Sequence, residues 1–255
     1  MSRGKEPIAF GLIVVGDEVL NGRRSDRHLA HFKALLGERG HFLAWHWVLP
    51  DDPPVLTDHL RFSMSRPAPV FVCGGIGATP DDHTRACAAA ASGVALALHP
   101  EAVALIEGRV GADAAYPSRI LMAELPQGCS LIPNPYNQIP GFSVGQHFFL
   151  PGFPEMAWPM AQWVLDTGFP TILAPQIELA VQVRGVPESR LIPLMQRLGD
   201  RFPEHKLFSL PHLGTDPHIL LGIRGREGID LAFEALRSEL AREQIEFTTP
   251  TPGGA

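Results

Sequence analysis

Cysteine is scarce in this 255-residue chain, and its three copies, Cys73, Cys87 and Cys129, form no CxxC pair. This scarcity argues against a disulfide framework and a structural zinc site, so we expect the three to be small core residues. Basic charge is also in short supply, because 21 Lys and Arg stand against 27 Asp and Glu, for a net charge of −6. Such a chain lacks the basic face expected of a protein that binds nucleic acid or an anionic membrane.

Long apolar runs are absent from the sequence as well. No run reaches the ~18 residues of a membrane span, and the leading MSRGKEP lacks the pattern of a cleavable signal peptide. We therefore expect a cytoplasmic protein without a membrane partner. Glycine and proline are abundant, at 25 residues each, which predicts many structured turns.

Short apolar runs alternate with helical patterns through most of the chain. Residues 8–15 form a β-branched apolar run of the kind found in strands that are covered on both faces. The expected elements are strand 8–15, helix 26–39, strand 42–49, helix 55–66, strand 69–73, helices 82–92 and 100–110, and strands near 129–132 and 146–150. This order predicts an α/β fold with a mainly parallel sheet and helices on both faces.

A second, smaller unit is expected after the segment TGFPTILAP, residues 167–175. The pattern beyond it is strand 177–184, helix 187–198, strands 205–210 and 218–224, and helix 229–243. We expect domains at 1–172 and 176–250, the second of them α+β, and a frayed tail in TPTPGGA. The GxxG at Gly222–Gly225 has the spacing of an RNA-binding loop, but it follows a strand in a unit that is not basic, so no nucleic-acid partner is expected.

The strongest chemical signal is CGGIGATPDDHT, residues 73–84, where a strand is expected to end and a helix to begin. Gly74, Gly75 and Gly77 permit backbone conformations and close approaches that a side chain would block. A glycine turn followed by free amides at a helix N-terminus is an anion site, and phosphate is its usual ligand.

The residues after these glycines predict a helix start. Thr79 fits the N-cap, Pro80 the first helical position and Asp82 the reciprocal capping acid. A simpler alternative stays open, in which the glycines only make a tight turn and the acids only complement the helix dipole. Asp81 argues against it, because a second carboxylate would repel a phosphate unless a divalent cation such as Mg²⁺ lay between them.

A second signal, VVGDEVLNGRRSDRH, follows the first expected strand. Gly16 makes a turn, Asp17 and Glu18 place two carboxylates after it, and Gly22 opens a loop that reaches Asp26. If strands 8–15 and 69–73 are neighbours, these acids and Asp81 and Asp82 converge at one sheet edge, where ligands bind in such folds. For Asp26, a helix N-cap and a ligand contact are both open.

The basic residues of this segment are ambiguous. Arg23 and Arg24 could meet phosphate oxygens or could be exposed and solvated. His28 and His31 could share a helix face and hold a metal, but no third ligand at zinc spacing accompanies them, so a solvated helix face is favoured.

A third signal joins NPYNQIPGF, residues 134–142, with LPGFPEM, residues 150–156. Their prolines and glycines, including Pro151 and Gly152, demand fixed turns. Asn134 offers paired donor and acceptor groups, which suit the edge of a heterocycle.

Taken together, these motifs resemble the molybdopterin-binding domain shared by the MoaB/Mog proteins and the competence/damage-inducible protein A family. GGIGATPDDHT is similar to GGxGPTxDDxT with Ala78 in place of proline, and GDEVLNGRRSD is similar to GDELLxGxxxD. NPYNQIPGF resembles NPxGxAPGF without its inner glycine, PGFPEM resembles PGVPxEM, and His28 stands where asparagine is usual. The resemblance covers about residues 8–172, and the tail resembles the small α+β domain that follows in competence/damage-inducible protein A. The deamidase domain of that family has no counterpart here, so deamidase activity is not expected.

The resemblance implies a phosphorylated pterin, molybdopterin among the possibilities, or an adenine dinucleotide as ligand, a divalent metal, and a homo-oligomer with a dimer favoured. It implies metal-binding and catalytic roles for Asp17, Asp81 and Asp82. The ligand contacts that it implies are Gly16, Glu18, Gly22, Asp26, Gly74, Gly75, Gly77, Thr79, Thr84, Asn134, Pro151 and Gly152.

Three functions are compatible with these motifs. The first is metal-dependent hydrolysis of an ADP-ribose-like pyrophosphate, or adenylyl chemistry. The second is a binding module that holds a pterin or nucleotide without reacting it. The third is a diverged relative that serves as a structural partner.

Overall fold

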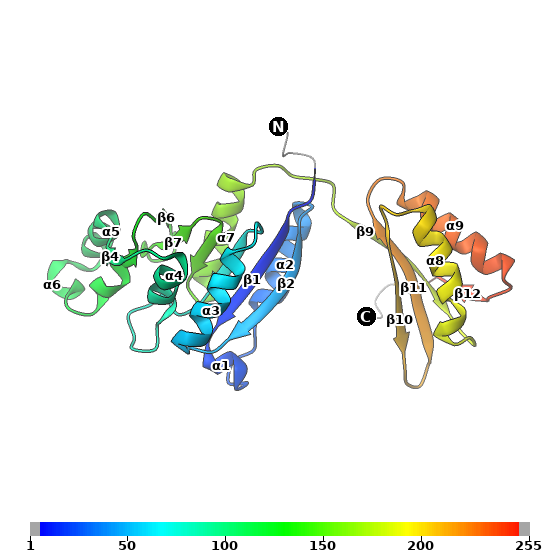
Figure 1. Ribbon diagram of the computed structural model, residues 1–255, viewed down its shortest axis with the longest axis horizontal. Coiled ribbons are helices and arrows are strands. Elements are labelled where there is room, and N and C mark those ends of the chain that lie inside the picture. The colour runs from blue at the N-terminus through cyan, green and yellow to red at the C-terminus, as the bar shows by residue number, and fades with distance from the viewer. Residues whose placement is uncertain (1–5, 250–255) are drawn as a thin grey trace. The chain divides into compact units, whose positions relative to one another are not determined.

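The computed structural model describes residues 6–249, so residues 1–5 and nearly all of the expected frayed tail lie outside the described residues. The chain divides into two compact units, Met1–Leu173 and Ala174–Ala255 (Figure 1). The first contains the motifs on which the family resemblance rests.

The first unit is built on a six-stranded sheet in the order β2-β1-β3-β8-β7-β6. Strands β2, β1, β3 and β8 run parallel, and β7 and β6 complete the sheet as antiparallel neighbours. The strands are β1 (Ala9–Val15), β2 (Phe42–Leu49), β3 (Val70–Cys73), β6 (Ser130–Ile132), β7 (Gly141–Val144) and β8 (His147–Leu150), and a separate antiparallel pair joins β4 (Leu96–Leu98) to β5 (Glu124–Pro126). The predicted α/β class with a mainly parallel sheet is confirmed.

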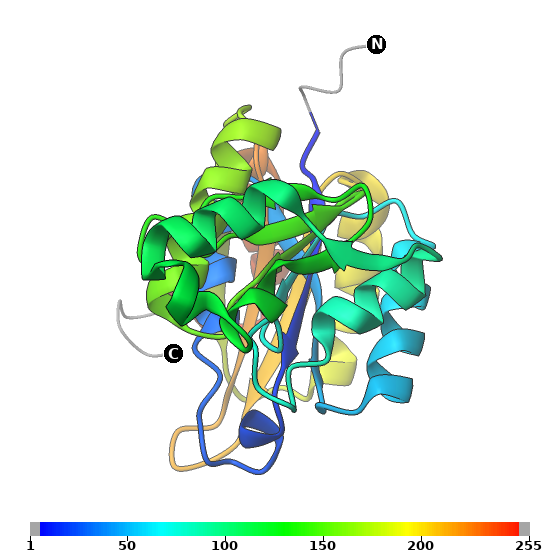
Figure 2. The same ribbon diagram turned by 90° about the vertical axis from the view of Figure 1, so that its left-hand side faces the viewer.

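Helices cover both faces of this sheet (Figure 2). They are α1 (Asp17–Leu20), α2 (His28–Glu38), α3 (Pro53–Met64), α4 (Thr84–Ser92), α5 (Pro100–Val110), α6 (Ala112–Ala115), the 3-10 helix η1 (Arg119–Ala123) and α7 (Pro154–Gly168). Side chains alternate along β1 between two hydrophobic clusters. Phe10, Leu12 and Val14 belong to the cluster that includes residues of α2 and α7, and Ile13 and Val15 belong to the cluster that includes residues of α3, α4 and α5. The three cysteines are free and buried, as expected.

The second unit is a four-stranded antiparallel sheet with two helices packed on one face. Its sheet order is β10-β11-β9-β12, and its core joins strand residues Val181, Leu221 and Ile223 to helix residues such as Leu194 and Leu236. Its elements are β9 (Ile177–Val183), η2 (Glu188–Arg190), α8 (Ile192–Arg201), β10 (Lys206–His212), β11 (His218–Gly225), α9 (Ile229–Arg242) and β12 (Phe247–Thr248). None of the helices in residues 6–249 has the length and apolar character that crossing a membrane requires.

Candidate functional site

The first unit has a cavity where its strand order changes direction. From β1 the chain passes to β2 on one side and then returns to β3 on the other, with β1 and β3 paired from Gly11↔Val70 to Val14↔Cys73. Ligands bind at such switch points, outside the carboxyl ends of parallel strands. A cavity of about 700 Å³ lies here, with walls from the segments that follow β1, β2, β3 and β8 and from the loop between β6 and β7.

Most of the predicted site residues line this cavity. They are Gly16, Glu18, Gly74, Gly75, Gly77, Thr79, Asp81, Asp82, Asn134, Pro151 and Gly152, together with Arg23 and Arg24. Asp17, Gly22, Asp26 and Thr84 do not line it.

The glycine loop after β3 needs glycine at two positions. Gly74 has φ +114°, and a Cβ added there would lie 2.2 Å from the carbonyl oxygen of Val15 on the neighbouring strand. Gly75 has φ +67°, and its Cβ would lie 2.2 Å from Oγ1 of Thr84. Thr84 is fully buried and its backbone N–H donates to the Gly75 carbonyl at 2.9 Å, so it supports the loop from behind.

The expected helix start at Thr79 and Pro80 is wrong, because α4 begins only at Thr84. The predicted reciprocal contact does exist, since Oδ2 of Asp82 accepts hydrogen bonds from the N–H of Thr79, at 2.8 Å, and from its hydroxyl. It closes a turn in which the Asp82 N–H donates to the Thr79 carbonyl at 3.0 Å. Asp82 therefore fixes the end of the glycine loop.

Arg85, the second residue of α4, holds the glycine loop from its buried side. Its guanidinium donates to the carbonyl of Gly77 at 2.9 Å, to that of Glu124 at 3.0 Å and to that of Leu121. Burial lowers the pKa of this side chain, which is 7% exposed. The three acceptors join the glycine loop to the segment that carries Met122 on the opposite wall.

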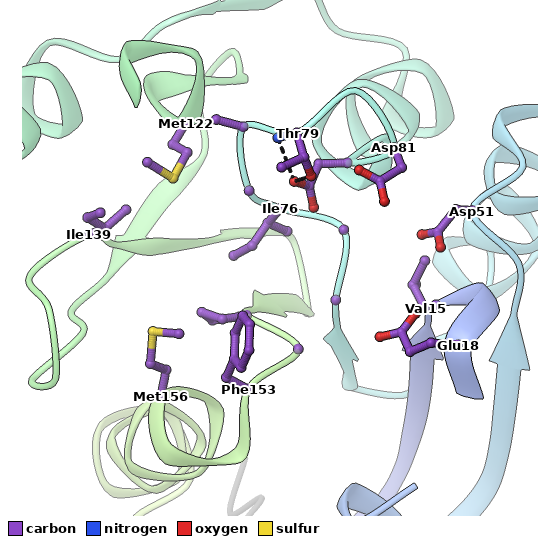
Figure 3. Close-up of a pocket in the computed structure, with 18 of the residues that line it drawn as sticks. Val15, Glu18, Asp51, Ile76, Thr79, Asp81, Met122, Ile139, Phe153 and Met156 are labelled. Atoms are coloured by element: carbon purple, nitrogen blue, oxygen red, sulfur yellow. Dashed lines mark hydrogen bonds between the residues drawn. The ribbon is translucent and has the colours of Figure 1, made fainter. Parts of the chain in front are cut away.

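One wall of the cavity is acidic. Figure 3 shows the carboxylates of Glu18, Asp51 and Asp81 on the same side of the glycine loop. Asp51 follows β2 and accepts a hydrogen bond from the backbone N–H of Asp17 at 2.9 Å. Burial, together with the negative charges of Asp17, Glu18 and Asp81, raises the pKa of Asp51.

Sequence reasoning missed Asp51, which begins the Asp-Asp-Pro-Pro stretch at residues 51–54, because such a composition is typical of a turn. Asp52 does have that local role, since its Oδ1 accepts from the N–H of Val55 at 3.0 Å and caps α3. The signal that could have identified Asp51 was its place directly after strand 42–49, at the sheet edge where Asp17 and Asp81 were already expected.

The opposite wall of the cavity is apolar. Ile76, Met122, Ile139, Phe153 and Met156 lie on the other side of the glycine loop from the acids (Figure 3). The loop that carries Ile139 is braced to α7, because Nδ2 of Asn137 donates to Sδ of Met156 at 3.2 Å. This wall offers a flat ring an apolar surface.

Asn134 borders the cavity with one hydrogen-bonding group already used. It is 4% exposed, and its Oδ1 accepts from the N–H of Tyr136 at 3.0 Å, which fixes the orientation of the amide. Its Nδ2 is buried and has no hydrogen-bond partner among residues 6–249. The side chain therefore presents a donor, where the sequence suggested a donor and an acceptor together.

Asp26 and His28 lie beside the cavity. Oδ1 of Asp26 accepts from the first two backbone N–H groups of α2, those of His28 at 2.7 Å and Leu29 at 3.3 Å, although Arg27 is the N-cap residue. Oδ2 of Asp26 lies 3.2 Å from Nε2 of His46. The expectation of a solvated face is wrong for His28, which is 4% exposed because its ring sits under the loop that follows β8.

No preformed metal site stands out in the part of the chain that the structure describes, since no group of three or more His, Cys, Asp or Glu side chains there is placed to hold an ion. The acidic wall nevertheless has a donor set suited to a hard divalent cation. Its carboxylate oxygens are the ligands that Mg²⁺ prefers, and a cation would relieve the repulsion from Asp17, Glu18 and Asp81 that adds to burial in raising the pKa of Asp51.

Residues 11–173 match the family described as "Probable molybdopterin binding domain". The chain belongs to this family. Membership in this molybdopterin-binding family is consistent with binding of a pterin or a nucleotide.

Three relatives illustrate the similarity. A CinA-like protein of Geobacter sp. (strain M21) is 30% identical over 239 residues, which are 91% of this chain and 57% of that protein. A protein of Pyrobaculum arsenaticum is 27% identical and matches over 95% of both chains. The crystal structure of the protein CinA from Thermoplasma acidophilum is 28% identical with a TM-score of 0.58, over 63% of this chain and 97% of that one. The chain thus spans little more than half the length of the CinA-like relative.

Proposed function

We propose that the cavity binds a phosphorylated heterocycle, either a pterin or an adenine dinucleotide, and that a divalent cation assists hydrolysis of its pyrophosphate. The observation that carries this proposal is the contrast between the two walls. The glycine loop, which suits phosphate, lies between an acidic wall that suits a cation and an apolar wall that suits a ring.

Each part of the ligand has residues to receive it. Backbone N–H groups of the glycine loop and the guanidinium groups of Arg23 and Arg24 suit phosphate oxygens. Met122, Ile139 and Met156 suit the faces of the ring.

The carboxylates of Asp51, Asp81 and Glu18 would hold the cation, and the backbone N–H of Asp17 donates to Asp51 at 2.9 Å. When bound, Mg²⁺ supplies charge neutralisation and polarisation at the phosphorus. In the balanced reaction, a water oxygen bonds to one phosphorus, the bridging P–O bond breaks, and ADP-ribose yields AMP and ribose 5-phosphate.

The test is release of AMP by purified protein from ADP-ribose, FAD or molybdopterin-AMP in the presence of Mg²⁺, Mn²⁺ or Co²⁺. We expect metal-dependent turnover that Asp51→Asn and Asp81→Asn lower at least about tenfold. Asp58→Asn, an exposed acid of α3 outside the cavity, is the matched control and should keep the parental rate. An absence of metal-dependent turnover, with Asp51→Asn equal to the parent, contradicts the catalytic proposal.

Two observations favour binding without reaction. Oδ2 of Asp82 is already used by Thr79, and the described residues offer no preformed group of three ligands for a metal. Calorimetry decides between the two functions. A ligand that binds tightly and is recovered intact supports a binding module, and failure to bind any pterin or nucleotide contradicts both.

The unpartnered donor of Asn134 provides a test of how the ligand is oriented. If the ring lies against the apolar wall, a ring nitrogen or carbonyl oxygen accepts from Nδ2 of Asn134. Asn134→Ala then weakens binding of ADP-ribose by about tenfold, the effect of one hydrogen bond, and leaves binding of inorganic pyrophosphate unchanged. Tyr136→Phe is the control from the same loop, because the Tyr136 side chain is 67% exposed and does not line the cavity. Equal losses for both probes would contradict this orientation.

A further inference from the structure

His28 contacts the cavity loop that follows β8 from behind. It is the first residue of α2, and its Nε2 lies 3.1 Å from the carbonyl oxygen of Gly152. A carbonyl oxygen can only accept, so the ring is the Nε2–H tautomer and donates this bond. The contact spans 124 positions of sequence and joins α2 to a residue that lines the cavity.

Gly152 in turn touches the glycine loop. A Cβ added at Gly152 would lie 3.4 Å from Cα of Gly74, so the two backbones are in close contact. A shift of the Gly152 backbone would therefore change the gap between two walls of the cavity. The bond from His28 fixes this spacing.

Neighbouring groups hold the ring in place. The backbone N–H of His28 is bound by Oδ1 of Asp26 at 2.7 Å, and the ring packs beside Phe32. Burial lowers the pKa of His28. Arg27 and His46 lower this pKa further, whereas the Gly152 carbonyl and Asp26 raise it. The other ring nitrogen, Nδ1, is buried without a hydrogen-bond partner among residues 6–249, so the Nε2 bond is the only hydrogen bond that the structure shows for this ring in those residues.

We propose that His28 is a positioning residue, whose Nε2–H tethers the Pro151–Phe153 segment and so sets the width of the ligand cavity. The tether itself rests on geometry alone, whereas its effect on ligand affinity rests on the function proposed above. No direct contact between His28 and the ligand is required.

Two substitutions separate the hydrogen bond from the bulk of the ring. His28→Gln places an amide N–H near the position of Nε2 and keeps a donor for Gly152, whereas His28→Leu fills similar space without a donor. His31→Leu is the matched control, because His31 lies one helical turn further on, stacks on Trp158 with ring centroids 4.0 Å apart, and does not line the cavity.

Two measurements are made on each full-length variant. Hydrogen exchange of peptides that cover residues 150–156 reports the tether without any ligand, and calorimetry with ADP-ribose and Mg²⁺ reports the cavity. For His28→Leu we expect exchange in this segment to speed up about tenfold and the affinity for ADP-ribose to fall about tenfold, the effect of one hydrogen bond. His28→Gln should stay within about threefold of the parent in both, and His31→Leu should match the parent.

Hydrogen exchange and calorimetry also distinguish failure of the tether from failure of the proposed function, on which the expected change in affinity rests. If the parent does not bind ADP-ribose, the proposed ligand is wrong, and the exchange arm alone decides the tether. Unchanged exchange at 150–156 in His28→Leu overturns the tether. Equal losses in His28→Gln and His28→Leu, accompanied by equal falls in melting temperature, overturn it as well, because they show a role in packing only.

Discussion

Buried His147 makes the stability of the first unit dependent on pH. The side chain is 3% exposed at the start of β8, and its Nε2 lies 2.8 Å from Oγ of Ser63, whose own proton is donated to the Leu60 carbonyl. Burial lowers the pKa of His147 from 6.5 to about 4. In the unfolded chain the imidazole regains its ordinary pKa, so between these two values the unfolded state binds more protons than the folded state.

The sign and size of the effect follow by linkage. The contribution of His147 to the free energy of unfolding is fully present above pH 6.5 and declines as the pH falls toward 4. The two pKa values differ by about 2.5, which corresponds to about 3.4 kcal/mol at the acid limit. Between pH 7 and pH 5 the loss is about 2 kcal/mol.

Urea unfolding of the parent and of His147→Gln measures this loss. Glutamine can still donate to Ser63 but does not titrate, so the difference between the two proteins removes the contribution of other groups. All four tryptophans, Trp45, Trp47, Trp158 and Trp163, belong to the first unit, so their fluorescence follows that unit alone. We expect the free energy of unfolding of the parent to fall about 2 kcal/mol further than that of the variant from pH 7 to pH 5. Parallel pH profiles would refute the reasoning.

Three further predictions concern the cavity. Gly75→Ala should lower the free energy of unfolding by about 2 kcal/mol more than Gly93→Ala. Both glycines have positive φ, but only a Cβ at position 75 would collide with Oγ1 of Thr84. Equal losses in urea unfolding would contradict this prediction. Asp51→Asn should raise the melting temperature measured without Mg²⁺, because it removes a carboxylate whose pKa is raised by burial and acidic neighbours. It should also abolish the increase in melting temperature that Mg²⁺ produces in the parent. A lower melting temperature without metal would contradict this prediction. Arg85→Lys should lower the free energy of unfolding of the first unit by about 2 kcal/mol, because one ammonium cannot reach the three carbonyls that the guanidinium joins. Urea unfolding at neutral pH measures this loss, and a value under about 0.5 kcal/mol would contradict the prediction.

The parts of the fold that could be predicted are those with strong local patterns. Residues 8–15 became β1 and residues 100–110 became α5, because an unbroken β-branched run and helical spacing each fix one element. Strand β7 (Gly141–Val144) was missed, since it begins in a loop rich in proline and glycine and is a strand only because β6 and β8 flank it. Helix α4 starts late for a similar reason, because the turn closed by Asp82 replaces its first turn.

The candidate site was predictable for residues that directly follow a strand and so lie at the carboxyl edge of the parallel sheet. Gly74, Gly75 and Asp81 line the cavity because their segment directly follows β3. Asp51 and His28 were harder to foresee, because the place of Asp51 depends on the pairing of β2 with β1, and that of His28 on a loop 124 residues away. Such positions are set by tertiary contacts, which no local pattern records.

The two hydrophobic cores of the first unit share residues with its cavity. Val15 belongs to the buried core on one face of the sheet, Ile76, Met122 and Ile139 pack against that core, and Met156 packs against the core on the other face. The apolar wall therefore contributes to folding as well as to the cavity, whereas the carboxylates of the acidic wall belong to neither core. In evolutionary terms, the charged side of the cavity can diverge with little selection from folding, while a change on its apolar side must also keep the sheet covered.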